Sequence, residues 1–207
     1  IKAHYRLAVE ENLQLWQRRL FKSAMKPVDR WYDQNGAILQ ALEAGLLDVP
    51  DLADETAAMI VDLLPTFERW GTWFDFMPLF EIVSENKKPL ELHVRLLVAQ
   101  GRVYVLNRNF QDAIELLETA LSLAKAHQLV EQEALVHYGL TNAYLGDQRY
   151  VQAEKHAIKG LRLFPATETT KIAALHNSLG LIKLETGAFA ASETQFKQAL
   201  ALWAAED

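Results

Sequence analysis

The side chains of this sequence that are best suited to hold a ligand are amides, a phenol and two guanidinium groups. An Asn amide both donates and accepts hydrogen bonds, which suits a peptide backbone, and a Tyr adds apolar area with a hydroxyl at its tip. An Arg would favour an anionic group on the ligand. The candidate ligand-binding residues are Arg95, Arg102, Tyr138, Asn142, Asn177 and Leu181. Their chemistry predicts the binding of a peptide segment or a small signal molecule.

No catalytic pattern accompanies these residues. The sequence has no Gly-x-x-x-x-Gly-Lys-Ser/Thr loop to hold phosphates, no His-Glu-x-x-His zinc pattern, no Gly-x-Ser-x-Gly elbow and no cysteine nucleophile. We therefore expect no enzyme activity, no metal site and no cofactor.

Composition and charge narrow the class of protein. Half of the 207 residues are hydrophobic, and only six prolines and nine glycines are present, which favours a helical fold. The net charge of −6 argues against a nucleic-acid module, because such modules usually carry a basic face. No apolar run approaches the roughly 18 residues of a membrane span. We expect a cytoplasmic protein without nucleic-acid or membrane partners. Its opening Ile-Lys-Ala-His, which lacks an initiator Met, indicates a piece of a longer chain.

The elements that would position the candidate residues recur about every 40 residues. Clear repeats start at Val94, Ala134 and Ala173, so their spacings are 40 and 39 residues. Such repeats are typical of paired helices that stack into a solenoid, because no unit buries its apolar face alone. In the first repeat we expect helices over 94–107 and 110–126. The recurring positions are an aromatic at the turn (Phe110, Tyr150, Phe189) and a small residue where the helices cross (Ala113, Ala153, Ser192).

The phase of these repeats places the candidate ligand-binding residues on the first helix of each unit. In a stacked array of this kind, that helix lines the concave surface. Polar and apolar residues alternate there, and two interpretations stay open. The face is either an ordinary solvated inner surface or a site for a bound peptide or small molecule.

Six histidines are scattered singly along the chain. His137 and His176 share one repeat position, so they could lie near each other on adjacent helices. We interpret them as helix-packing side chains rather than a metal pair, because no carboxylate or thiolate support accompanies them.

The first half of the chain is less regular. A degenerate repeat is expected over 57–93. It contains an aromatic cluster that we interpret as core: Phe67, Trp70, Trp73, Phe74, Phe76 and Phe80. Residues 1–56 form a helical lead-in. One helix is expected from about His4 to Met25, and a second carries Trp31 and Leu42, with Asp51 as a candidate N-cap for the next helix.

The region 94–206 resembles the tetratricopeptide repeat. Matching residues are Leu140, Leu179, Gly101, Gly180, Tyr104, Tyr144, Phe110, Tyr150, Ala113, Ala153, Phe196, Ala120 and Ala199. The family's Trp position is lost, since Leu97, His137 and His176 stand there. The resemblance implies an all-α, right-handed superhelix of antiparallel helix pairs, with three regular repeats over 94–207 continuous with the preceding segments.

The first half is similar to the segment that follows the winged helix in bacterial STAND (NB-ARC-like) signal-transduction ATPases, and the repeat region of maltose-type transcriptional activators is a relative. The similarity rests on Trp31-Tyr-Asp-Gln-Asn35, Ile38-Leu39-x-Ala41-Leu42 and Trp70-Gly71-x-Trp73. Gln34 departs from the Glu that is usual there. The resemblance implies a regulatory sensor arm that binds a protein, peptide or signal molecule. The alternative is a self-standing adaptor that scaffolds two proteins, and the oligomeric state is left open.

Overall fold

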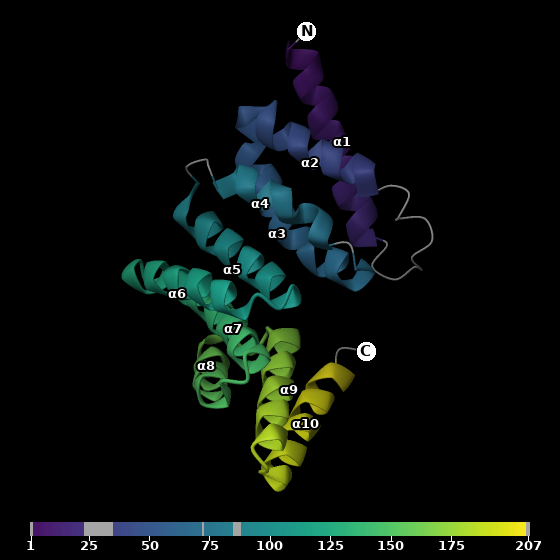
Figure 1. The fold of residues 1–207 in the computed structure, drawn as a ribbon. Helices are drawn as coiled ribbons and strands as arrows, with labels where there is room; N and C mark the ends of the chain where they lie inside the picture. Colours follow the sequence, from purple (N-terminus) through teal and green to yellow (C-terminus); the bar gives the residue numbers. More distant parts are fainter. Residues whose placement is uncertain (1, 23–34, 72, 85–87, 206–207) are drawn as a thin grey trace. The chain divides into compact units, whose positions relative to one another are not determined.

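In this computed structural model, the described residues are 2–22, 35–71, 73–84 and 88–205. They form ten α-helices and two short 3₁₀ helices, and these ranges contain no strand (Figure 1). The predicted all-α class is confirmed. The chain divides into two compact units, Ile1–Ala99 and Gln100–Asp207. The division falls inside helix α5 (Leu90–Leu106).

The first unit is centred on α2 (Asn35–Leu47), which contacts α1, α3 and α4. These neighbours are α1 (Lys2–Lys22), α3 (Ala53–Trp70) and α4 (Met77–Ser84), with 3₁₀ helices η3 (Pro50–Leu52) and η4 (Trp73–Phe76) between them. Ile38 and Leu42 of α2 are fully buried, as is Phe67 of α3. Each helix therefore contributes an apolar face to one core.

Two details of the first half of the chain differ from expectation. Asp51 lies within η3 and is not the N-cap of α3, because Leu52 occupies that position without a side-chain capping bond. In the aromatic cluster, Phe67 stacks on Phe76 with ring centroids 3.7 Å apart, whereas Phe74 is exposed. Phe74 is therefore not part of the predicted core. The predictions for Trp31, Gln34 and Met25 lie outside the described residues.

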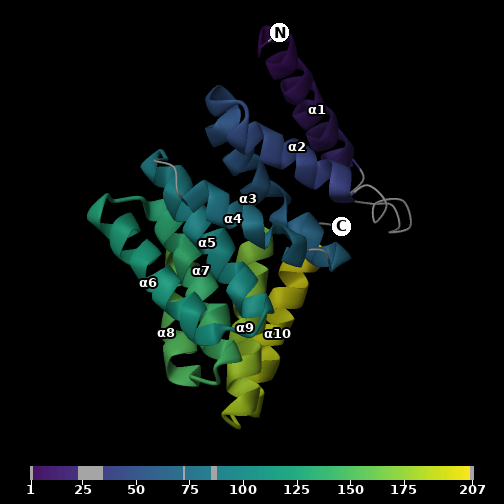
Figure 2. The same cartoon turned by 45° about the horizontal axis from the view of Figure 1, so that its top comes forward.

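The second unit contains the remainder of α5 and five further helices. These are α6 (Phe110–Ala126), α7 (Val130–Gly146), α8 (Tyr150–Leu163), α9 (Thr169–Glu185) and α10 (Phe189–Ala204). The helices expected over 94–107 and 110–126 correspond to α5 and α6, and α6 has the predicted ends. Helix α7 packs along α8, and α9 packs along α10 (Figure 2). Helix α7 also contacts α6 and α9.

Four of the turns in this unit have the same backbone geometry. In each turn, the second residue after the end of the helix has a left-handed φ: Arg108 (62°), Gln128 (57°), Gln148 (58°) and Gly187 (77°). The following N–H donates to the carbonyl five residues back, as from Arg149 to Tyr144 at 2.8 Å. This arrangement is the Schellman motif, which satisfies carbonyls at a helix end. The motif lets each helix reverse into the next within three residues.

Candidate functional site

The predicted ligand-binding residues of the second unit lie mainly on α7 and α9. Tyr138 and Asn142 are four residues apart on α7, and Asn177 and Leu181 are four residues apart on α9. Residues at this spacing share one face of a helix. Tyr138, Asn142 and Asn177 are half-buried and Leu181 is exposed. Since α7 and α9 are in contact, both pairs belong to neighbouring helices.

A polar contact joins the two helices at this point. Asn142 Oδ1 on α7 lies 3.4 Å from Ser178 Oγ on α9, and Ser178 Oγ also donates to Ala174 O at 3.0 Å. A hydroxyl has only one hydrogen, so the shorter bond to Ala174 is the stronger of the two. The Asn142 amide is therefore held beside α9 but is only weakly engaged.

The polar ends of these side chains are available to a ligand. Among the described residues, the Tyr138 hydroxyl, the Asn142 amide nitrogen and the Asn177 amide have no protein hydrogen-bond partner. By contrast, the Tyr144 hydroxyl on the same helix donates to Glu118 Oε1 at 2.7 Å. Each of the three groups is half-buried and has hydrogen-bonding capacity that no described residue uses, so a ligand can bond to it in place of water.

The two arginines are placed differently. Arg95 belongs to the first unit, where its guanidinium forms an ion pair with Asp62 at 2.5 Å. Arg102 is half-buried on the part of α5 in the second unit and is also engaged in an interaction. The ligand-binding roles of Arg95 and Arg102 stay predictions, and Arg95 would have to exchange Asp62 for a ligand.

A second cluster was not foreseen as such: a pair of histidines packed between α7 and α8. His137 Nδ1 lies 2.9 Å from His156 Nδ1, and the His137 ring is fully buried. At this distance one ring donates and the other accepts, so at most one Nδ1 carries a proton. His137 Nε2 lies 3.5 Å from Glu133 Oε1, one turn earlier on α7. His137 Nε2 is buried and makes no hydrogen bond within the described chain, so the contact with His156 is the hydrogen bond of this ring there.

Both histidines are held neutral by their surroundings. Burial lowers the pKa of His137 to about 3, with further lowering by the positive charges of His156, Lys159 and Lys125. Burial likewise lowers the pKa of His156 to about 4, and Lys159 and Lys155 add to this effect while Glu118 opposes it. The pair is therefore a neutral contact between α7 and α8, and the burial of His137 agrees with its interpretation as a helix-packing side chain.

His137 and His176 share a repeat position and could lie near each other, but their hydrogen bonds are made to other residues. Each pairs within its own helix pair, across the same sequence separation: His137 with His156, and His176 Nδ1 with Gln195 Oε1 at 2.8 Å. The sequence could have indicated these pairings, because His156 and Gln195 each follow the histidine of their helix pair by 19 residues.

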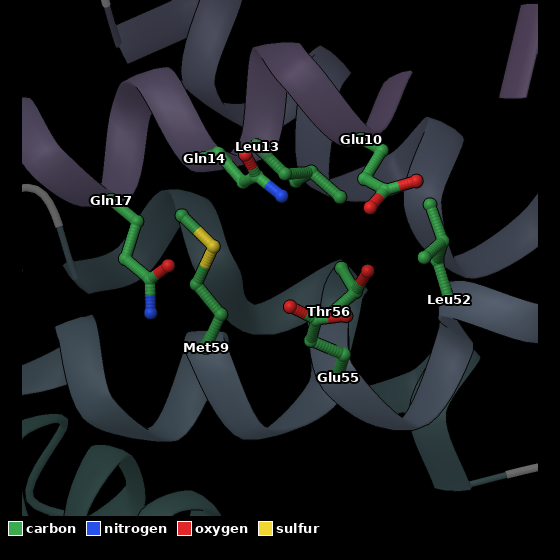
Figure 3. Close-up of a pocket in the computed structure, with 8 residues that line it drawn as sticks. All are labelled: Glu10, Leu13, Gln14, Gln17, Leu52, Glu55, Thr56 and Met59. Carbon is green, nitrogen blue, oxygen red and sulfur yellow. The ribbon is translucent and has the colours of Figure 1, made fainter. Parts of the chain in front are cut away.

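The first unit contains a small hollow between α1 and α3 (Figure 3). Glu10 and Gln14 of α1 face Thr56 and Met59 of α3 across it. Its volume of about 20 Å³ is that of a single water molecule, so it cannot admit a metabolite. Thr56 Oγ1 is fully buried beside it and finds no hydrogen-bond partner in the described chain.

Within the described ranges, no group of three or more His, Asp or Glu side chains converges as a metal site requires, and no helix there is long and apolar enough to cross a membrane.

Comparisons with other proteins do not assign this chain to a family. No model of a protein family, no curated protein and no solved structure matches the sequence.

Proposed function

We propose that the chain is a non-catalytic binding module that holds a peptide segment or small signal molecule along α7 and α9. One observation carries this proposal: Tyr138, Asn142 and Asn177, on two helices in contact, have polar groups that no described residue bonds. An extended peptide offers one N–H and one C=O per residue, and an amide side chain can form hydrogen bonds with both. Leu181 and the Tyr138 ring supply apolar area beside these groups.

The proposal includes a finer fold and a wider context. The helix pairs of the second unit are tetratricopeptide-like and form part of a right-handed superhelix, with α7 and α9 on its concave side. The chain acts as the regulatory sensor arm of a larger STAND-type ATPase. The reading frame upstream of Ile1 tests this context directly. A Walker motif and a winged helix encoded there support the sensor arm, whereas a frame that begins close to Ile1 supports the self-standing adaptor.

The binding site itself is tested by selecting ligands from a random peptide library on the purified chain. A selected peptide is then titrated by calorimetry into the parent, Tyr138→Ala and Asn142→Ala. Each substitution is expected to weaken binding at least about tenfold, or ~1.4 kcal/mol, because it removes a contact at the centre of the site.

Asn109→Ala is the matched control for the amide. Asn109 is exposed in the turn before α6 and makes no side-chain capping bond, so its loss is expected to leave affinity unchanged. Unchanged binding by both Tyr138→Ala and Asn142→Ala, at unchanged helicity, would place the site elsewhere and refute the proposal.

A further inference from the structure

The last helix pair presents an apolar groove to solvent. Side chains of α9 and α10 line it: Leu184, Phe189, Ser192, Glu193, Phe196, Lys197 and Leu200. Its volume is about 380 Å³, enough for several side chains. Phe189 is 68% exposed and Leu200 is 65% exposed, and Trp203 one turn further is 39% exposed. Large aromatic and aliphatic side chains gathered on one helix face indicate an interaction surface.

Equivalent faces of α6 and α8 are covered by the helix that follows them. Gly139 and Gly146 of α7 sit so close to α6 that a Cβ on either would meet Leu117 or Phe110, the equivalents of Phe196 and Phe189. A Cβ on Gly160 of α8 would likewise lie 2.9 Å from Leu175 of α9. No helix follows α10 in the described chain. The groove is thus shaped for a packed helix.

The burial of one equivalent position shows the same difference. Ala124 of α6 is fully buried and Phe164, which follows α8, is 7% exposed. Trp203 occupies this position in α10 and is 39% exposed. Among the described helix pairs, Trp203 is therefore the most exposed residue at this position.

The charges on α10 indicate which helix fits the groove. Glu193 and Lys197 are the charged residues of this helix. Both are exposed, and Lys197 Nζ pairs with Glu193 Oε1 of the same copy at 2.7 Å. They lie one turn apart, near the middle of the stretch from Phe189 to Leu200. A second α10 running antiparallel, with the two-fold axis near Gln195, would place each Glu193 beside the other copy's Lys197. The same axis would bring Phe189 of each copy near Leu200 of the other. A parallel arrangement would set like charges against each other.

We propose that this groove is a self-association surface, on which α10 of a second copy packs antiparallel around a two-fold axis. The interface is isologous, so each favourable pair occurs twice. A single helix pair with the edges of two α9 helices is smaller than a standard interface of about 1,600 Å², so we expect a reversible dimer rather than a permanent one. Its lining residues are distinct from those of the proposed peptide site on α7 and α9.

Charge reversal tests the proposal. Sedimentation equilibrium of the 207-residue chain across the micromolar range is expected to show a monomer–dimer equilibrium. Glu193→Lys gives each copy two lysines at the axis, and Lys197→Glu gives two glutamates, so each single variant is expected to dimerise at least tenfold more weakly. An equimolar mixture of the two variants is expected to recover association as a heterodimer. The double variant is expected to recover it as a homodimer.

Glu115→Lys, an exposed charge reversal on α6, is the matched control and is expected to dimerise as the parent does. Tyr138→Ala is expected to leave dimerisation unchanged, which separates this surface from the peptide site. Circular dichroism verifies that each variant is folded. A parent that stays monomeric across the range overturns the proposal. So do single reversals that associate as the parent does, or a mixture that fails to recover association.

Discussion

At the scale of single residues, three of the helix-ending turns place a non-glycine residue in the left-handed region, and a substitution there can relieve the backbone strain. Gln148 has φ 58° and its side chain is exposed. A residue with a Cβ is less stable in this left-handed region than glycine is, by about 1–2 kcal/mol. Gly187 occupies the same place in the turn before α10, and a Cβ there would meet no atom within 4 Å. The two turns thus differ in backbone cost and not in packing.

Gln148→Gly is expected to raise the free energy of unfolding by about 0.5–1 kcal/mol, because relief of the left-handed strain exceeds the added entropy of the unfolded glycine. Gly187→Ala is expected to lower it by a similar amount. Urea denaturation followed by circular dichroism measures both. Equal stability of Gln148→Gly and the parent, together with a neutral Gly187→Ala, would contradict this view of the turns.

At the scale of helices, the crossing of each pair depends on small residues at matched places. Ala113 and Ala153 are fully buried, and Ser192 at the equivalent place donates to Gly180 O at 2.8 Å. Volume is also balanced one turn further along the pair. Gly101 opposes Leu117 and Gly180 opposes Phe196, where an added Cβ would lie 2.8 Å and 2.5 Å from the partner.

The middle pair reverses this balance of volumes. Thr141 stands at the position of Gly101 and Gly180, and Ala157 stands at that of Leu117 and Phe196. Both are fully buried. The larger side chain has moved to the first helix and the smaller one to the second, so the space between the helices is filled from the opposite side. Close packing tolerates such exchanges when the total volume is kept.

Ala153→Leu is expected to destabilise the second unit by about 1–3 kcal/mol, because the crossing of α7 and α8 has no room for the larger side chain. Val151→Leu, two residues earlier on an exposed part of α8, is the matched control and is expected to change stability by less than about 0.5 kcal/mol. Thermal denaturation compares the two. An unchanged midpoint for Ala153→Leu would show that the crossing lies at another residue.

At the scale of the whole molecule, the sequence predicts helices better than it predicts partners. The ends of α6 at Phe110 and Ala126 follow from apolar spacing and the turn that precedes it, which are local properties. The pairing of His137 with His156 depends on how two helices face each other, and the repeat position alone does not specify that. Arg95 could be assigned to a face, but its partner Asp62 comes from the less regular first unit.

The candidate ligand site shows the same limit. The spacing of Tyr138 and Asn142 places both on one face of α7, which the sequence predicts correctly. Whether their polar groups are used by the protein depends on tertiary neighbours such as Ser178. The exposed groove of α9 and α10 was not predicted either, because an apolar α10 has the same pattern whether or not another helix covers it.

The histidine pair links protonation to the folding of the whole second unit. In the unfolded chain each imidazole regains an ordinary pKa near 6.5, whereas the folded values are about 3 and about 4. Between roughly pH 6.5 and pH 4 the unfolded state therefore binds protons that the folded state does not. Stability contributed by the neutral pair is present above pH 6.5 and is lost as the pH falls. Each histidine can add a slope of at most about 1.4 kcal/mol per pH unit.

His156→Gln tests this linkage, because it copies the His176–Gln195 contact of the next helix pair and leaves one titrating ring. The parent is expected to lose stability between pH 7 and pH 5, measured by urea denaturation at each pH. The variant is expected to lose about half as much of the histidine-dependent part, since a Gln amide stays neutral throughout. Its amide nitrogen can still donate to His137 Nδ1, so the variant is expected to stay folded at pH 7. Equal pH dependence in the two proteins would mean that His156 is not held neutral by burial, and that the space between α7 and α8 admits its charged form.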